Sequence, residues 1–273
     1  MKAHRKPALL GALGLAGGAA LVALVGLPQG ISAQTAAAAS AEKCAALGQI
    51  AQPGLEITRA EFTPEGPATA PPGATAALLP AHCIVNGMID RRIGVGGREF
   101  GIGFELRLPT DWNGRFLFQG GGGLDGVVLP ATGAIANSAG PPALARGFAV
   151  VTTDSGHSGS PIDASFGLDQ QARTDYAYNA LDKVTDEAKR LIGSYYGTAP
   201  DYSYFLGCSN GGRQALVASQ RLPLEFDGIV AGDPAMSFSR LALGQVWSMQ
   251  VVARIAPRDA DGRPIYSRAF SDA

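Results

Sequence analysis

The spacing of hydrophobic residues predicts four strands between residues 84 and 153. Apolar and polar side chains alternate over residues 84–89 and 100–108, which is typical of neighbouring antiparallel strands with one face against a core. Residues 115–119 form a short apolar strand that ends at four glycines, and residues 147–153 are almost entirely apolar. An all-apolar strand is expected where both faces of a sheet are covered. The sheet is therefore predicted to continue from an antiparallel start into a deeply buried part.

The second half of the chain alternates between helical and strand periods. Residues 173–196 carry apolar side chains at helical spacing, and Gly197 follows as a stop. Residues 202–206 then predict a strand, residues 214–220 a helix, and residues 226–231 another buried strand. Strands that alternate with helices in this way favour an α/β fold with a mostly parallel sheet.

The start of the chain has the pattern of an export signal. Three Lys or Arg residues lie within the first six positions, and an uncharged run of mainly Ala, Leu, Gly and Val follows at residues 7–27. With small residues around position 33, this order predicts a signal peptide over residues 1–33. An uncleaved membrane anchor is the alternative, because the run is long enough to span a bilayer. Either way the folded part is expected outside the cytoplasm, secreted or periplasmic.

Composition and charge exclude several kinds of partner. The chain has 22 Lys and Arg against 23 Asp and Glu, with neither a basic patch nor a cationic amphipathic helix. We therefore expect no nucleic-acid partner and no membrane contact beyond the leader. A chain of 273 residues can bury one sizeable core. The Ala-rich residues 34–46 and the Pro-, Ala- and Gly-rich residues 63–80 are expected to be low-complexity surface stretches.

A nucleophile motif lies between the strand predicted at 202–206 and the helix that follows it. Residues 207–211 read Gly-Cys-Ser-Asn-Gly and fit the G-x-S-x-G elbow, in which a serine sits on a strained turn between strand and helix. The flanking glycines leave space for the tightly folded backbone. Ser209 is the predicted catalytic nucleophile, and the backbone N–H of Asn210 is a predicted oxyanion donor at the helix N-terminus.

A second glycine-rich segment follows the strand predicted at 115–119. Residues 120–123 are all glycine, so their backbone can approach a substrate carbonyl without side-chain obstruction. We expect Gly121 or Gly122 to supply the second oxyanion donor. The run lacks the spacing and the Lys-Ser/Thr ending of phosphate-binding loops. A flexible turn without a function is the alternative.

The histidine and acid of a catalytic triad are hard to place in this sequence. In α/β-hydrolases, which carry the G-x-S-x-G elbow, the acid and the histidine both follow the serine along the chain. No histidine follows Ser209 in this sequence. His157 and Asp154 precede it by about 50 residues, and we expect His157 to be a structural or pocket-wall residue rather than a general base. Asp233 is the one local substitute for the acid.

Longer stretches around the glycine motifs resemble the tannase and feruloyl esterase family. The resemblance covers most of residues 44–250 and is carried by five segments: 118–126, 152–157, 207–214, 219–223 and 226–235. The elbow with its adjacent cysteine, Gly-Cys-Ser-Asn-Gly-Gly-Arg-Gln, is the most specific of them. The resemblance implies an α/β-hydrolase fold and hydrolysis of esters of aromatic acids such as gallate, ferulate or terephthalate.

The resemblance also implies a role for each of three cysteines. Cys44 and Cys83 stand where the family has a disulfide, and two separately buried thiols are the alternative. Cys208 stands where the family's cysteine pairs with one beside the late catalytic histidine, so we expect Cys208 to be unpaired here. An odd number of cysteines in an exported chain agrees with one free thiol.

The family's acid and histidine come after a large inserted lid, which predicts that this chain is an N-terminal fragment. Residues 34–240 are then the N-terminal part of an incomplete α/β-hydrolase domain, and residues 241–273 the start of the lid. No cofactor or metal is assigned to these residues, because the family's calcium site lies in the lid. Besides an aromatic-ester hydrolase, two alternatives stay open: an inactive domain that binds phenolic ligands, and a thiol-reactive protein that uses Cys208.

Overall fold

A mixed seven-stranded sheet organises the computed structural model, which describes residues 29–68, 77–134 and 140–266. The strand order is β1-β4-β5-β7-β6-β8-β9. The strands are β1 (Leu55–Thr63), β4 (His82–Ile93), β5 (Glu99–Pro109), β6 (Arg115–Gln119), β7 (Ala149–Thr153), β8 (Tyr202–Cys208) and β9 (Gly228–Gly232). Two very short strands, β2 (Gly66–Pro67) and β3 (Leu78–Leu79), pair with each other beside it.

The first three strands of the sheet are antiparallel, as the alternating pattern predicts. β4 pairs with β5, and β5 pairs in turn with β7, both antiparallel. β1 was not predicted, although its sequence Leu-Glu-Ile-Thr-Arg also begins with alternating residues. It pairs with β4 at the sheet edge and keeps most of its side chains partly or fully in solvent, so its apolar signal is weak.

The other strands form the predicted parallel half. β7, β6, β8 and β9 are hydrogen-bonded side by side in parallel, and every residue of β7 is buried. β6 and β8 are neighbours although more than 80 residues separate them in the chain. Because the carboxyl ends of parallel strands meet at one edge, the glycine run after β6 and the elbow after β8 come together there.

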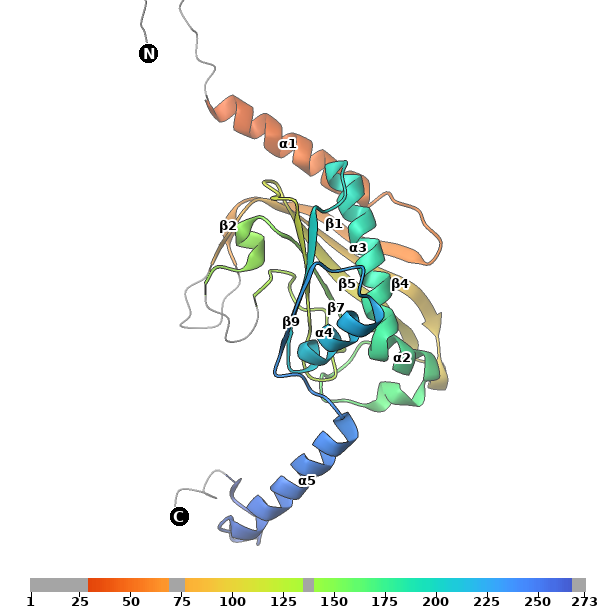
Figure 1. The fold of residues 1–273 in the computed structure, drawn as a ribbon, viewed down its shortest axis with the longest axis vertical. Helices are drawn as coiled ribbons and strands as arrows, with labels where there is room; N and C mark the ends of the chain where they lie inside the picture. The colour runs from red at the N-terminus through yellow and green to blue at the C-terminus, as the bar shows by residue number, and fades with distance from the viewer. Residues whose placement is uncertain (1–28, 69–76, 135–139, 267–273) are drawn as a thin grey trace, which may run out of the picture.

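Helices cover one face of this sheet (Figure 1). The predicted helix at 173–196 is present as α2 (Gln170–Thr174), a π-helical segment (Asp175–Asn179) and α3 (Ala180–Tyr196). Gly197 ends α3 in the left-handed conformation, with φ of 81°. The predicted helix at 214–220 is α4 (Asn210–Arg221), which begins directly after Ser209. The main core lies between these helices and aromatic strand residues, including Phe104, Phe118 and Phe205.

The Ala-rich N-terminal stretch at 34–46 lies mostly at the surface, as predicted, and forms a helix, which the sequence analysis did not predict. α1 (Gln29–Leu47) is rich in alanine, the residue with the highest helix propensity. Its last turn is anchored, because Cys44 and Leu47 are buried. α1 runs through the predicted cleavage position near 33, and the rest of the predicted signal peptide, residues 1–28, lies outside the described residues.

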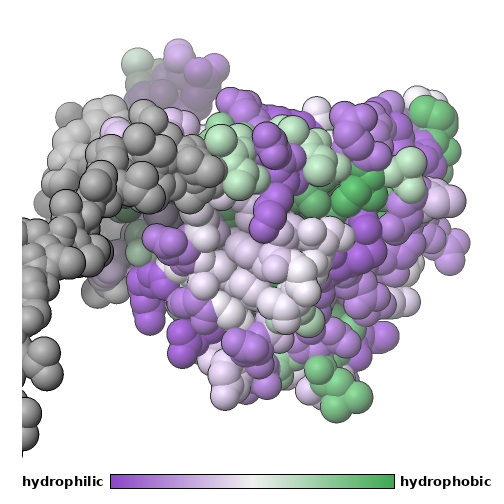
Figure 2. Space-filling view, turned by 90° about the horizontal axis from the view of Figure 1, so that it is seen from above, coloured by the Kyte–Doolittle hydropathy of each residue, from purple (hydrophilic) through white to green (hydrophobic). Residues whose placement is uncertain are grey.

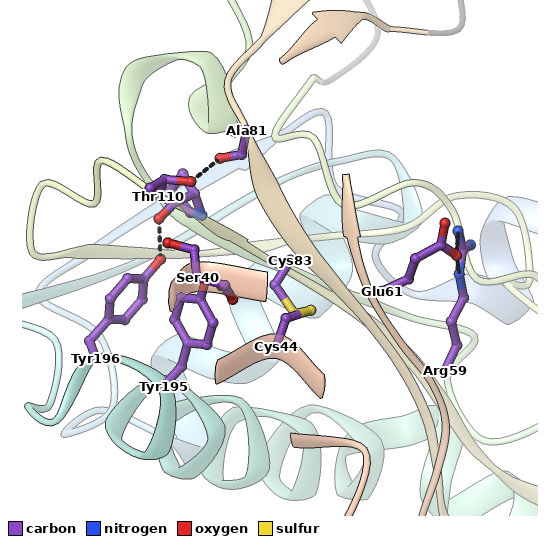
Figure 3. Close-up of a disulfide and its surroundings, with 10 residues drawn as sticks. Ser40, Cys44, Arg59, Glu61, Ala81, Cys83, Thr110, Tyr195 and Tyr196 are labelled. Carbon is purple, nitrogen blue, oxygen red and sulfur yellow. Dashed lines mark hydrogen bonds and ion pairs between the residues drawn. A yellow bond between two sulfur atoms is a disulfide. The ribbon is translucent and has the colours of Figure 1, made fainter. Parts of the chain in front are cut away.

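A disulfide joins this helix to the sheet. Cys44 of α1 is bonded to Cys83 of β4, in agreement with the pairing that the resemblance implies (Figure 3). Tyr195 and Tyr196 of α3 lie beside the bridge, and their hydroxyls donate to the carbonyls of Ser40 (3.4 Å) and Pro109 (2.6 Å). The disulfide, α1 and α3 therefore hold the antiparallel edge together.

The last helix differs from the others in its surroundings. α5 (Phe238–Ile255) extends away from the sheet and buries none of its residues (Figure 1). Its exposed apolar side chains include Leu243, Val246 and Trp247. The predicted boundary between residues 240 and 241 falls inside this helix.

The surface at the opposite end is different in character. Seen from above, it is mostly polar, with hydrophobic residues in separate patches (Figure 2). Within residues 29–68, 77–134 and 140–266, no helix combines the length and apolar character that a membrane span requires.

Removal of the disulfide is predicted to lower stability. The bridge closes a loop of 39 residues, for which the chain-entropy relation gives about 4 kcal/mol. We expect Cys44→Ser to lower the free energy of unfolding by about that amount in urea titrations at equilibrium. Cys208→Ser is the matched control and should change it by less than about 0.5 kcal/mol. Equal effects of the two substitutions would contradict this assignment.

Candidate active site

Ser209 occupies the sharp turn between β8 and α4 that the sequence predicts for a nucleophile. Its φ of 58° and ψ of −119° lie outside the regions that L-residues prefer. The residue is exposed, whereas its neighbour Asn210 is buried. Backbone hydrogen bonds fix the turn on both sides: the Ser209 N–H donates to Gly232 O (3.1 Å), and Ser209 O accepts from Arg213 N (3.0 Å) and Ala235 N (3.1 Å).

Glycines are required around this turn because backbone packs directly on backbone. A Cβ added to Gly207 would lie 2.3 Å from Gly211 O, and one added to Gly211 would lie 2.8 Å from Gly121 O. A Cβ on Gly120 would lie 2.8 Å from the Cα of Gly211. The two glycine motifs that the sequence singles out are therefore in direct contact.

The two glycines predicted as oxyanion donors are not equivalent in the structure. The Gly121 N–H donates to the side-chain Oε1 of Gln214 (3.0 Å), and Gly121 O accepts from Gly211 N (3.0 Å). Gly122 is only partly buried, and a Cβ added to it would meet no atom within 4 Å. Of the two alternatives, the structure leaves Gly122 facing open space and places Gly121 in a hydrogen bond within the protein.

A buried polar network surrounds the elbow, and the sequence analysis missed it. Asp125 accepts hydrogen bonds from Ser155 Oγ (2.6 Å), from Gln214 Nε2 (2.7 Å) and from the side chain of Asn210. Asn210 Oδ1 in turn accepts from Arg213 Nε (2.7 Å) and from a tyrosine hydroxyl of the π-helical segment. Apart from the tyrosine, every residue of this network lies in a segment that carries the family resemblance. That resemblance is the one signal in the sequence that could have identified these residues.

His157 is packed as a structural residue, which agrees with the expectation from the sequence. Its ring stacks on Phe166 with centroids 3.7 Å apart and meets the edge of Tyr176 at 6.2 Å. Neither ring nitrogen forms a hydrogen bond with the described residues. Burial lowers the pKa of His157 to about 4, so the imidazole is neutral and has no contact through which to serve Ser209.

The other sequence candidates are also accounted for. Asp154 is buried, and its Oδ1 accepts from Gly103 N and Gly156 N, both at 2.9 Å. Burial raises the pKa of Asp154 to about 7. Asp233 is exposed in the turn after β9, with φ of 40°. Cys208 is a partly exposed free thiol.

An apolar groove lies beside the glycine loop. It has a volume of about 490 Å³ and includes Gly122 in its wall. The remaining lining residues are Gly123, Asp125, Val127, Leu129, Pro161 and Ile162. Because most of this lining is apolar, an aromatic or aliphatic group can rest against it next to the Gly122 N–H. Among the described residues, no cluster of three or more His, Cys, Asp or Glu is arranged to hold a metal ion.

The fold and the elbow together define a class of protein. A mixed sheet with helices on its face, with an exposed serine at φ of 58° between β8 and α4, is the arrangement of α/β-hydrolases.

Comparison with known proteins narrows this class. The family described as "Tannase and feruloyl esterase" matches residues 84–260, so the chain belongs to the tannase and feruloyl esterase family. The chain is 44% identical over 212 residues to a mono(2-hydroxyethyl) terephthalate hydrolase of Piscinibacter sakaiensis, a match that covers 75% of this chain and 35% of that protein.

Solved structures of a feruloyl esterase and a tannin acyl hydrolase are similar to this chain, in agreement with the family assignment. The crystal structure of feruloyl esterase B from Aspergillus oryzae matches with a TM-score of 0.64 and 29% identity, covering 81% of this chain and 42% of that one. Tannin acyl hydrolase from Aspergillus niger matches with a TM-score of 0.54 and 25% identity, covering 74% and 37%. The chain thus spans between 35% and 42% of the length of these relatives.

The strained turn gives a prediction about stability. Glycine adopts positive φ without the strain that a side chain adds, so Ser209→Gly should be about 1 kcal/mol more stable than Ser209→Ala in urea unfolding. Alanine is the matched control because it removes the hydroxyl and keeps the strain. An equal or lower stability of the glycine variant would show that the turn is not strained.

The two buried titratable groups give opposite pH dependences. His157 has its folded pKa lowered from 6.5 to about 4, so the unfolded chain binds more protons between these values and the contribution of His157 to stability rises with pH. Asp154 has its folded pKa raised from 3.8 to about 7, so the folded chain binds more protons and its contribution falls as pH rises.

Substitutions should separate these contributions. Phenylalanine can stack on Phe166 without losing a hydrogen bond, so we expect His157→Phe to lose stability relative to the unmodified chain by about 1.4 kcal/mol per pH unit between about pH 4 and 6.5. Asp154→Asn keeps an acceptor for both backbone N–H groups and should change in the opposite direction. Denaturant titrations at several pH values measure both slopes, and slopes of the same sign would be inconsistent with the assignment.

Proposed function

We propose that this chain carries the nucleophile and the oxyanion donors of an exported carboxylic ester hydrolase that acts on esters of aromatic acids. The observation that carries the proposal is the contact between the elbow at Ser209 and the glycine loop at Gly120 and Gly121. This contact brings to one edge of the sheet an exposed serine, the N-terminus of α4 and the amide of Gly122, which donates to no backbone carbonyl of the described residues.

In this chemistry the Ser209 Oγ attacks the ester carbonyl carbon and forms a tetrahedral intermediate. The carbonyl oxygen becomes an oxyanion, which the backbone N–H groups of Gly122 and Asn210 stabilise, helped by the dipole of α4. Collapse of the intermediate releases the alcohol and leaves an acyl group on Ser209, which water then removes. Both halves require a base that accepts and returns the proton.

The substrate class is inferred from the groove and from the relatives. The groove beside Gly122 is lined by Val127, Leu129 and Ile162, which suit a flat apolar ring better than a charged one. The names of the similar proteins point to feruloyl, tannin and terephthalate esters. We propose an ester of gallate, ferulate, terephthalate or a similar acid as the substrate.

The general base is proposed to lie outside the described residues. His82 is the first residue of β4 and is buried, with its Nδ1 hydrogen-bonded to Pro80 O at 2.7 Å. His157 is buried against the ring of Phe166. By the family resemblance, the triad acid and histidine follow a lid that begins near residue 241, and calcium would bind in that lid. The described residues hold no cluster suited to calcium, so no step is assigned to a metal.

An activated ester tests the nucleophile without needing the base for the leaving group. p-Nitrophenolate leaves unprotonated, so p-nitrophenyl ferulate should slowly acylate Ser209, and the acyl group should persist because deacylation lacks its base. We expect peptide mass spectrometry to find one feruloyl group, on the peptide that contains Ser209. Ser209→Ala should abolish the label, and Ser219→Ala, a substitution at an exposed serine of the same helix, should keep it.

Other results would redirect the assignment. A thioester on Cys208 would favour the thiol-reactive alternative, and ligand binding without any acylation would favour the binding domain. For methyl ferulate, whose leaving group needs a proton, we expect hydrolysis near the uncatalysed rate. Ordinary enzymatic turnover that Ser209→Ala removes would place the base within these residues, and His157 would be the first to substitute.

A further inference from the structure

Asp125 is a buried carboxylate that has no direct part in the proposed chemistry. It lies two residues after the glycine run, is 3% exposed and has a φ of 56°. Its backbone N–H donates to Gly122 O (2.9 Å), so the loop folds back on itself. Burial raises the pKa of this carboxyl, which means that its ionised form is costly unless hydrogen bonds compensate.

Three donors from two other segments meet this carboxylate. Ser155 Oγ (2.6 Å) and Gln214 Nε2 (2.7 Å) donate to Oδ2, and the Asn210 side-chain amide donates to Oδ1. Ser155 Oγ also accepts from Gln214 Nε2 at 3.0 Å. Ser155 belongs to the loop after β7, whereas Asn210 and Gln214 are in α4, so Asp125 ties three chain segments together.

One branch of the network reaches the oxyanion donor of the elbow. Asn210 is 2% exposed. Its side-chain amide nitrogen donates to Asp125, and its side-chain oxygen accepts from Arg213 and Tyr176. A side chain fixed in this way also fixes the Cα and the backbone N–H of the same residue. That N–H is the proposed donor at the first position of α4.

The other branch reaches the glycine loop. Gln214 donates to Asp125 and accepts from the Gly121 N–H at 3.0 Å. Gly121 O accepts from Gly211 N at 3.0 Å. Gly121 O and the Gly122 N–H belong to the same planar peptide group, so the bond from Gly211 N also fixes the orientation of the Gly122 N–H. Asp125 thus acts directly on Asn210, and on the Gly122 amide through Gln214 and Gly121.

We propose that Asp125 is the positioning residue of the oxyanion hole, holding the Gly122 amide through Gln214 and the Asn210 amide directly through the Asn210 side chain. The inference rests on the proposed esterase function. Asp125 itself touches neither the substrate nor the reacting serine in this mechanism. Its effect should therefore fall on the rate of the chemical step and not on substrate binding.

Asp125→Asn tests this proposal with almost no change of volume. The amide has one acceptor oxygen and one NH2 group, so at least one of the three donors faces another donor. We expect the maximal rate of Ser209 acylation by p-nitrophenyl ferulate to fall at least about tenfold, with the half-saturating concentration changed less than about twofold. Amide hydrogen exchange should become at least about tenfold faster at residues 120–123 and at the start of α4.

Asp154→Asn is the matched control, because Asp154 is equally buried but bonds only to Gly103 N and Gly156 N, which the amide oxygen can still accept. It should alter neither the acylation rate nor exchange in the glycine loop. The proposal is overturned if Asp125→Asn behaves like this control, or if its loss appears only in the half-saturating concentration.

A milder variant covers the case in which Asp125→Asn does not fold. Ser155→Ala removes one donor to Asp125 and one acceptor for Gln214, and should give a smaller loss in the same direction. Unchanged exchange and acylation in this variant would count against the proposal. Because hydrogen exchange does not depend on ester chemistry, failure of the unmodified chain to acylate would contradict the proposed function alone.

Discussion

The close approach of two backbone segments is the constraint on which this site depends. The glycine run after β6 lies against the elbow after β8, so near that a Cβ on Gly120 would lie 2.8 Å from Gly211 Cα and one on Gly207 2.3 Å from Gly211 O. A hydrogen bond from Gly211 N to Gly121 O fastens the contact. Only residues without side chains can pack in this way. The position of Ser209 relative to the amide of Gly122 follows from it.

The sheet makes this approach possible. β6 and β8 are adjacent parallel strands, so their carboxyl ends lie at the same edge and release the two loops next to each other. β7, on the other side of β6, contributes the loop with Ser155 and His157. The antiparallel strands, α1 and the disulfide stabilise the far edge, remote from the chemistry. The strain at Ser209 is therefore carried by a rigid frame rather than by the turn alone.

Hydrophobic pattern and local motifs predicted the strands at β4 to β9, the helices at α3 and α4, and the elbow at Ser209, because each of these has a strong local signal. β1 escaped because an exposed edge strand needs few apolar residues, and α1 because an alanine run lacks an amphipathic face. The network at Asp125 could not be predicted from hydrophobic pattern or local motifs. The fold brings its members together from the glycine loop, the loop after β7 and α4. Nothing in the local sequence distinguishes a buried aspartate such as Asp125 from one at the surface.

In the proposed mechanism, the amides of Gly122 and Asn210 hold the former carbonyl oxygen of the tetrahedral intermediate that forms on Ser209. A crystal structure of the chain with an aromatic boronic acid tests this most directly, since boron bonded to the serine oxygen imitates the tetrahedral intermediate. We predict boron on Ser209 Oγ and one boronate oxygen within about 2.7–3.1 Å of both amide nitrogens, with the ring in the groove of Val127 and Leu129. A boronate oxygen that contacts neither amide, or boron bonded to another residue, would contradict the account.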